Sequence, residues 1–126
     1  MPSGDAFTDA QQREISKATA TATAQTGLLF SVYIGAVEGE IRDYSERLHA
    51  ALGPMTDRAV LVVVSPADRQ LEIVTGAICV RRLTDKACAL AALSMTTAFA
   101  GGDLVGGLVT GLRMMSDAAG KELVAG

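Results

Sequence analysis

Apolar and polar positions along this chain fall into blocks whose spacing alternates between that of helices and that of strands. In the first block, residues 9–25, the side chains that share one side at helical spacing are Ile15, Ala18, Ala22 and Gln25. Its stretch ATATATA also alternates with a period of two, as a strand would, but the alanine content and the following Gly27 favour a helix. The helix is expected to begin at Thr8-Asp9-Ala10-Gln11, which matches a capping box.

The next two blocks predict a buried strand followed by an amphipathic helix. The run LLFSVYIGA, from Leu28 to Ala36, is rich in β-branched and aromatic residues, which is typical of a strand buried on both faces. Apolar positions then recur at helical intervals, at Ile41, Tyr44, Leu48 and Leu52, and Gly53-Pro54 closes the helix. The opposite side of this helix carries charged residues that we expect to lie in solvent: Arg42, Asp43, Glu46 and Arg47.

The stretch VVVSPADRQLEIVTG predicts a β-hairpin. Ala59–Ser65 is a second buried strand, and Pro66–Arg69 is a turn in which proline presets φ and the aspartate can bond to the backbone. Gln70–Thr75 returns antiparallel with an alternating pattern, which places it nearer an edge of the sheet, and Gly76 ends it. Residues 78–83 are predicted to form a short further strand or an extended segment.

Two helices are predicted after the hairpin. Thr84 caps the first, and the charge of Asp85 suits the positive end of its dipole. The sequence AGGD ends this helix, and Asp103 caps the second. We expect Gly107 and Gly111 to allow close approach of a neighbouring element. The buried line of the last helix is Leu104, Leu108, Leu112 and Met115.

The resulting order of elements is α-β-α-β-β-α-α. A helix separates the first two strands, so they should be parallel and joined by a right-handed crossover. With the hairpin this gives a small mixed sheet between helices, a three-layer α/β/α sandwich in the α/β class. A length of 126 residues favours one domain. We expect residues 1–7 to be a flexible lead and residues 8–126 to form that domain.

Composition and charge narrow the classes of function. Apolar residues make up 49% of the chain and aromatic residues 4%, so the core must be built mainly from aliphatic side chains. The net charge of −3 and the lack of a basic stripe argue against nucleic acid as a partner. The longest apolar run, Ala87–Leu93, is far shorter than the roughly 20 residues that span a bilayer, and no signal-peptide pattern opens the chain. We therefore expect a soluble, cytoplasmic protein.

Few residues suit nucleophilic or metal chemistry. His49 is the single histidine and no serine has a histidine at a recognisable spacing, so a Ser-His-acid device is not indicated. We expect His49 to be a partly exposed helix residue. Cys79 and Cys88 are not spaced as a zinc pair. We expect buried thiols, with a disulfide across a strand–helix junction as the open alternative.

The succession of pieces along the chain resembles a known family. The pieces are LLFSVYIGAVEGEIRDYSERLH, RAVLVVVSPADRQLEIVTG, RRLTDKAC and AFAGGDLVGGLVTGL. In this order they resemble the TPM domain over roughly residues 12–115, and within that group an actinobacterial branch of unknown function. The resemblance implies the same α/β/α sandwich.

The resemblance also implies a site in the loop before the second strand and at the start of the helix after the third. The matching residues are Asp57 and Asp85, which could meet at a sheet edge where ligands bind and hold calcium or another divalent cation. The chain departs from the family at Arg58-Ala59, where Asn-Gly is common, and at Ile78 and Val80, where a second glycine and a glutamate are frequent. Compared with the family, the chain therefore lacks one acidic residue of the site and the flexible backbone around it. Our first expectation is a domain that binds no cofactor.

Arginines form the second half of the candidate ligand-binding site. Arg81 and Arg82, with Arg58 near them, could bind a phosphate or carboxylate group through bidentate contacts. The alternative is that they are solvated, or paired at the surface with Glu72, Asp57 or Asp85. The two aspartates likewise have a structural alternative, as a turn residue and a helix-start residue.

Two classes of function follow. The first is a non-catalytic protein-interaction or regulatory module of the TPM type that binds a partner protein or itself, and the lack of a complete catalytic constellation favours it. The second is a weak metal-dependent phosphatase in which Asp57 and Asp85 hold a divalent cation and Arg81 or Arg82 orients phosphate. A related alternative is a domain that binds an anion through its arginines alone.

Overall fold

The structure, a computed structural model, describes residues 8–120. Its helices and strands are α1 (Asp9–Thr26), β1 (Leu29–Ile34), α2 (Ile41–Ala50), β2 (Ala59–Ser65), β3 (Gln70–Thr75), α3 (Asp85–Ala100) and α4 (Leu104–Ala119). Two short 3-10 segments, η2 (Gly53–Arg58) and η3 (Cys79–Arg81), precede β2 and α3. The predicted order α-β-α-β-β-α-α is confirmed, while the predicted lead, residues 1–7, lies outside the described part.

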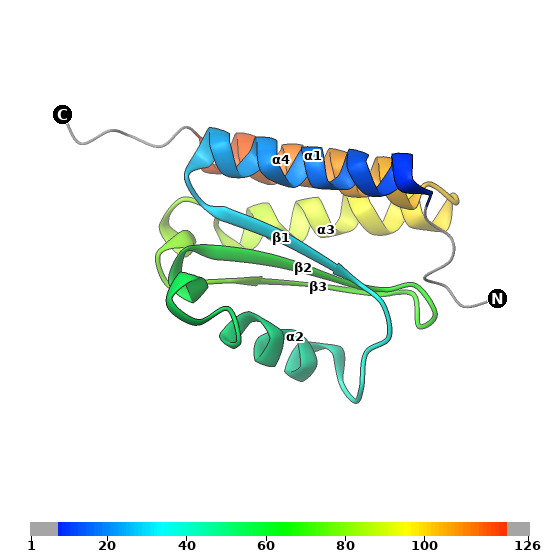
Figure 1. Cartoon of the computed structure of the whole chain (residues 1–126), viewed down its shortest axis with the longest axis horizontal. Helices are drawn as coiled ribbons and strands as arrows, with labels where there is room; N and C mark the ends of the chain where they lie inside the picture. Colours follow the sequence, from blue (N-terminus) through cyan, green and yellow to red (C-terminus); the bar gives the residue numbers. More distant parts are fainter. Residues whose placement is uncertain (1–7, 121–126) are drawn as a thin grey trace.

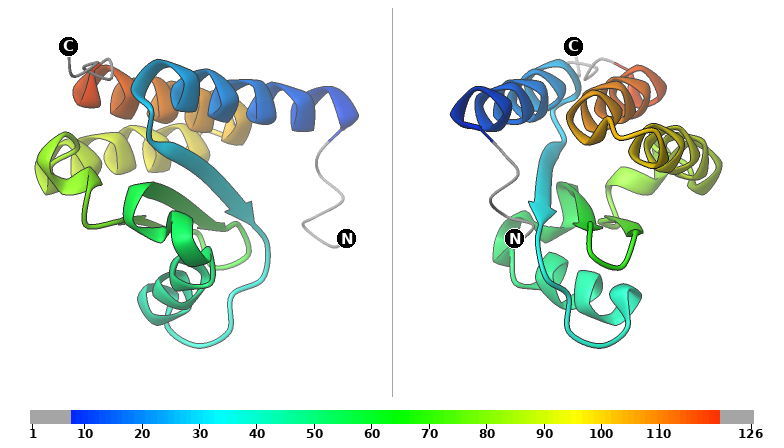
Figure 2. Two further views of the ribbon diagram at one scale, coloured as in Figure 1. Left: turned by 60° about the vertical axis from the view of Figure 1, so that its left-hand side comes forward. Right: turned by 90° about the vertical axis from the view of Figure 1, so that its right-hand side faces the viewer.

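The sheet is mixed and has the strand order β1-β2-β3 (Figure 1). β1 and β2 are parallel, in a register that runs from Leu29 opposite Ala59 to Ile34 opposite Val64. β2 and β3 form the predicted antiparallel hairpin. Helices α1, α4 and α3 cover one face of the sheet and α2 covers the other, as the two views of Figure 2 show. The three-layer α/β/α sandwich is therefore confirmed.

Local sequence signals place the helix ends. The capping box of α1 is formed, since the Gln11 N–H donates to the Thr8 hydroxyl and the Thr8 N–H donates to the Gln11 side chain, both at 3.0 Å. Gly27, at φ 78°, ends α1 in the left-handed conformation. The Thr84 hydroxyl accepts from the Ala87 N–H at 3.2 Å, and the Asp103 carboxylate accepts from the Gly106 N–H at 2.9 Å.

The core lies mainly between the sheet and the layer of three helices. Every residue of β2 is buried. Val60, Val62 and Val64 share a cluster with Leu108 and Met115 of α4. Because side chains alternate along a strand, Leu61 and Val63 point to the opposite face, toward α2. Burying an aliphatic side chain of this size contributes about 1.5–3 kcal/mol, so β2 is the main source of apolar stabilisation in the sheet.

Glycines allow α3 and α4 to pack closely. A Cβ on Gly107 would lie 2.8 Å from Cβ of Ala98 and 3.0 Å from the ring of Phe99. A Cβ on Gly111 would overlap the side chain of Met95, which is fully buried. The expectation that Gly107 and Gly111 allow close approach of a neighbouring element agrees with these distances, and that element is α3.

The strand or extended segment predicted at residues 78–83 is wrong. This segment turns locally, with the N–H of Cys79 bonded to the carbonyl of Gly76 at 3.0 Å and the N–H of Leu83 bonded to the carbonyl of Cys79 at 2.8 Å. The apolar residues of this segment suggested a strand, but only Cys79 and Leu83 are buried and the residues between them are not. A short helical turn gives the same burial without a strand partner.

Gly76 is fixed by its surroundings. Its N–H donates to the carbonyl of Ala59 at 2.9 Å, and a Cβ at this position would overlap the backbone of Thr56 and Asp57. The loop after β3 can therefore lie against η2 only because residue 76 has no side chain.

We expect Gly76→Ala to destabilise the domain by about 3 kcal/mol, because the added methyl group would collide with the backbone of η2. Gly101→Ala is the matched control, since Gly101 has a φ of −84° and a Cβ there would come no nearer than 3.5 Å to the carbonyl oxygen of Ala98. The control should change the free energy of unfolding by less than roughly 0.5 kcal/mol. Urea unfolding followed by circular dichroism compares the variants, and equal stabilities would contradict this role of Gly76.

Candidate functional site

The candidate residues from the sequence all lie around one end of the sheet. Asp57 and Arg58 are in η2, Arg81 is in η3, Arg82 directly follows it, and Asp85 is the first residue of α3. We call the surface formed by η2 and residues 76–82 the rim. Because η2 leads into β2, the rim lies at the amino ends of the parallel strands. The rule that ligands bind open α/β sheets at an edge refers to the carboxyl ends, so it does not support this location.

Backbone contacts join the two halves of the rim. The N–H of Ile78 donates to the carbonyl of Asp57 at 2.9 Å. The thiol of Cys79 lies 3.7 Å from the same carbonyl and 3.6 Å from the carbonyl of Ala59. Together with the close approach at Gly76, these contacts hold η2 against the chain that enters η3. The rim is thus a fixed part of the fold.

His49 supports the rim from α2. The expectation of a partly exposed residue is wrong, since only 6% of His49 is exposed. Its Nε2 lies 2.9 Å from the carbonyl of Ala59, and the hydroxyl of Thr56 donates to the carbonyl of His49 at 3.2 Å. A carbonyl oxygen can only accept a hydrogen bond, so Nε2 carries the proton. The histidine joins α2 to the start of β2.

Arg82 is bound to the ends of two helices. Its guanidinium donates to the carbonyls of Thr26 at 2.7 Å, Gly120 at 2.6 Å and Ala119 at 3.3 Å. The last carbonyls of a helix have no partner within the helix, and a cation there also interacts favourably with the helix dipole. Arg82 therefore ties the ends of α1 and α4 to the segment before α3.

The other two arginines of the rim differ from Arg82. Arg58 and Arg81 are exposed, and neither forms an ion pair within residues 8–120. Pairing of these two arginines with Glu72, Asp57 or Asp85, one alternative from the sequence, is not seen in the described part of the chain. Arg58 and Arg81 are the cations of the rim that stay accessible.

Asp57 in the rim and Asp85 at the start of α3 are both exposed. No group of three or more His, Cys, Asp or Glu side chains that could hold a metal ion is present among residues 8–120. Calcium requires about six to eight oxygen ligands, so Asp57 and Asp85 alone do not fit it. It is the backbone carbonyl of Asp57 that takes part in the fold, through Ile78.

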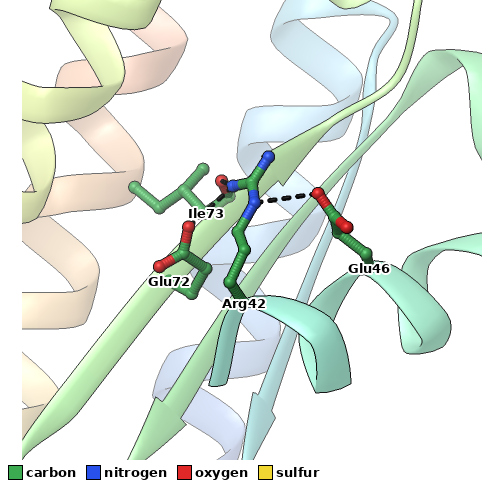
Figure 3. Close-up of polar contacts among 4 residues, drawn as sticks. All are labelled: Arg42, Glu46, Glu72 and Ile73. Atoms are coloured by element: carbon green, nitrogen blue, oxygen red, sulfur yellow. Dashed lines mark hydrogen bonds and ion pairs between the residues drawn. The ribbon is translucent and has the colours of Figure 1, made fainter. Parts of the chain in front are cut away.

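Glu72 is instead engaged by α2, at the free edge of β3 (Figure 3). Arg42 bonds to Glu72 at 2.6 Å and to Glu46 at 2.9 Å, and it lies 3.5 Å from the carbonyl oxygen of Ile73. The hydrogen bond that Arg42 donates to Glu72 raises the pKa of Arg42 above its ordinary value. A charged side chain across an edge strand discourages pairing with another strand.

Both cysteines are free thiols, so the alternative of a disulfide between Cys79 and Cys88 is not realised. Cys79 lies in η3 and not in a strand. Burial raises the pKa of both thiols, that of Cys88 to about 11. A raised thiol pKa gives little of the reactive thiolate near neutral pH, so neither cysteine is set up as a nucleophile.

The rim carries an apolar surface that the sequence did not reveal. Met55, Ile78 and Val80 are exposed by 42%, 52% and 47%, and they are three of the five large apolar side chains exposed within residues 8–120. From the sequence, Ile78 and Val80 were assigned to a strand or extended segment. Their exposure depends on η3, which the pattern did not indicate.

The fold defines the class of protein, an α/β domain in which a small mixed sheet is packed between helices. The BA42 protein of the psychrophilic bacterium Bizionia argentinensis has this fold, with a TM-score of 0.80 and 19% identity over 90% of this chain and 81% of that one. The N-terminal domain of cg2496 from Corynebacterium glutamicum matches with a TM-score of 0.78 and 14% identity, over 97% and 80% of the two chains. At these identities the likeness concerns the fold alone.

The chain belongs to the family described as Domain of unknown function (DUF5130), whose profile matches residues 1–116. The uncharacterized protein Rv2468c of Mycobacterium tuberculosis strain H37Rv is 35% identical over 89 residues, which are 69% of this chain and 52% of that protein. The chain spans about half the length of the curated relatives it matches. No activity is established for the family or for these relatives.

We expect Arg82→Met to lower the free energy of unfolding by about 2–3 kcal/mol, because three carbonyls lose a charged donor while the length of the side chain is kept. Arg81→Met is the matched control and should stay within about 0.5 kcal/mol of the parent, since its side chain is exposed. Chemical denaturation measures both. If the two variants were equally stable, Arg82 would not be the structural tie described above.

We expect alkylation of Cys88 in the folded protein to be slow at pH 8 and to accelerate with pH up to about 11, its pKa. Relative to an ordinary thiol, the raised pKa leaves roughly a hundredfold less thiolate at pH 8. The same shift means that folding stability falls as the pH rises above the ordinary thiol pKa, because the unfolded chain then loses the proton first. Iodoacetamide labelling followed by mass spectrometry compares native and urea-unfolded protein, and equal rates at Cys88 would contradict the assignment.

Proposed function

We propose that this domain is a non-catalytic interaction module that binds another protein, or a second copy of itself, through the rim. The observation that carries the proposal is the exposed apolar set Met55, Ile78 and Val80, held on two short segments that are bonded to each other. Burial of such side chains on a partner is the main source of affinity at protein interfaces.

The rigidity of the rim supports this proposal. Gly76 lies against η2, His49 joins α2 to β2, and Arg82 fixes the chain after η3. A surface that is already ordered loses little conformational freedom on binding, so more of the contact energy appears as affinity. Apolar side chains on a loose loop would lack this advantage.

The charges around the apolar set fit an interface as well. Arg58 and Arg81 lie on the same two segments, exposed and without an ion pair among the described residues. Arginine is enriched at protein interfaces, where its stem packs on apolar groups and its head bonds to acidic ones. A partner with an apolar patch bordered by carboxylates would complement the rim.

The phosphatase alternative has less support, because Asp57 and Asp85 come with no third ligand and the accessible arginines do not belong to a catalytic set.

A cytoplasmic location is part of the same proposal. Within residues 8–120, no helix has both the length and the apolar character needed to cross a membrane.

We expect Ile78→Asp to weaken binding to the partner at least tenfold while leaving the fold intact, since a carboxylate in an apolar interface loses its hydration without a bonding partner. Leu93→Asp is the matched control, because Leu93 is an exposed leucine on α3, away from the two rim segments. Sedimentation velocity over a wide concentration range measures self-association. Immobilised parent and variants, incubated with a lysate of the host, measure binding to other proteins.

The proposal predicts a dimer, or a set of retained proteins, that the parent and Leu93→Asp share and that Ile78→Asp loses. Loss of binding with Leu93→Asp alone would move the interface to α3. A parent protein that stays monomeric and retains nothing specific would overturn the proposal.

A further inference from the structure

A cavity of about 420 Å³ lies at the opposite end of the sheet from the rim, beside the carboxyl end of β2. It is formed by the β2–β3 turn, the last turns of α3 and the start of α4. In open α/β sheets this is the edge at which ligands bind, because strand ends and loops leave a crevice there. The volume falls within the range of about 300–1,000 Å³ that is common for small-molecule sites.

The base of the cavity is apolar and continuous with the core. It is lined by Val64, Phe99 and Leu104. Val64 is 1% exposed and belongs to the main core cluster, and the other two pack against that cluster while remaining partly accessible. An apolar group placed here would therefore be removed from water on several sides.

One positively charged residue, Arg69, lines the cavity, and its backbone has an unusual conformation. Arg69 lines the cavity and is the one non-glycine residue with a positive φ, 54°, among residues 8–120. Glycine or asparagine is the usual choice at such a position, so an arginine there is unfavourable for the local backbone. Residues kept in unfavourable conformations concentrate at functional sites.

The guanidinium of Arg69 is available to a ligand. It forms no ion pair within residues 8–120. The nearest acidic residue in sequence, Asp68, accepts a hydrogen bond from the hydroxyl of Ser65 at 3.0 Å. Gln70 and Thr96 also line the cavity, and they add neutral hydrogen-bonding groups near the cation.

We propose that this cavity binds a small amphiphilic monocarboxylate. Its apolar body lies on Val64, Phe99 and Leu104, and its carboxylate accepts hydrogen bonds from Arg69. A single arginine beside an apolar base favours one carboxylate attached to a ring or short alkyl chain over a multiply charged phosphate, which would need more cations. This site is separate from the rim, so the proposal does not depend on the proposed function.

The test is a titration of the whole chain with 4-phenylbutyrate, followed by ¹H–¹⁵N NMR spectra. We expect saturable shifts centred on the amides of Ser65, Gln70, Thr96 and Leu104. The uncharged analogue 4-phenylbutanol should bind at least tenfold more weakly, because it cannot form the charge-assisted bond to Arg69. Inorganic phosphate alone should leave these amides unshifted.

Arg69→Gly separates binding from folding. Glycine adopts a positive φ without strain, so the melting temperature of this variant should equal or exceed that of the parent. Its affinity for 4-phenylbutyrate should fall at least tenfold, to that of the alcohol, while its affinity for the alcohol should be unchanged. Arg81→Gly on the rim is the control and should bind both probes as the parent does.

Ala100→Phe is a second variant, in which an exposed residue that lines the cavity is enlarged to fill it. It should weaken binding of the acid and the alcohol alike. The proposal is overturned if neither probe binds at millimolar concentration, if the shifts centre on another region, or if Arg69→Gly binds the acid as tightly as the parent.

Discussion

The structure depends on one constraint, the complete burial of β2. All of its residues, from Ala59 to Ser65, are removed from solvent. Such a strand must be covered on both faces and paired along both edges, because unpaired backbone groups in a core are costly. β1 and β3 satisfy its edges, α2 covers one face, and α1, α4 and α3 cover the other. The connection through α2 follows, since two parallel strands need a crossover.

The two ends of β2 have different surroundings for the same reason. At its start, the carbonyl of Ala59 accepts from the N–H of Gly76 and lies within bonding distance of His49 and Cys79, so the rim is drawn tightly together. At its other end, a short turn follows directly, and the helices α3 and α4 are joined by Gly101 and Gly102 near it. Few side chains fill that end, and a cavity remains. The rim therefore presents a surface, whereas the other end presents a hollow.

The sequence predicted the features that depend on neighbours along the chain. Thr8, Thr84 and Asp103 cap helices through residues three positions ahead, and the hairpin strands differ in pattern because only one of them is fully buried. It did not predict features that join distant segments through the backbone. Arg82 bonds to carbonyls 37 to 56 residues away, and any residue can supply a carbonyl, so no motif marks these contacts. For the same reason the sequence did not show which of the candidate side chains are already bonded within the fold, as that of Arg82 is.

The same distinction explains how a fold can be shared at 14–19% identity. Asp57 is held through its carbonyl oxygen, and Gly76 is required because a side chain would meet the backbone of η2. Neither contact uses the carboxylate of Asp57, so the loop keeps its position whether or not an acid is present. The side chains of Arg58, Ile78 and Val80 are exposed, so this backbone arrangement does not depend on them. The backbone contacts fix the position of the rim, and its exposed side chains can vary without moving it.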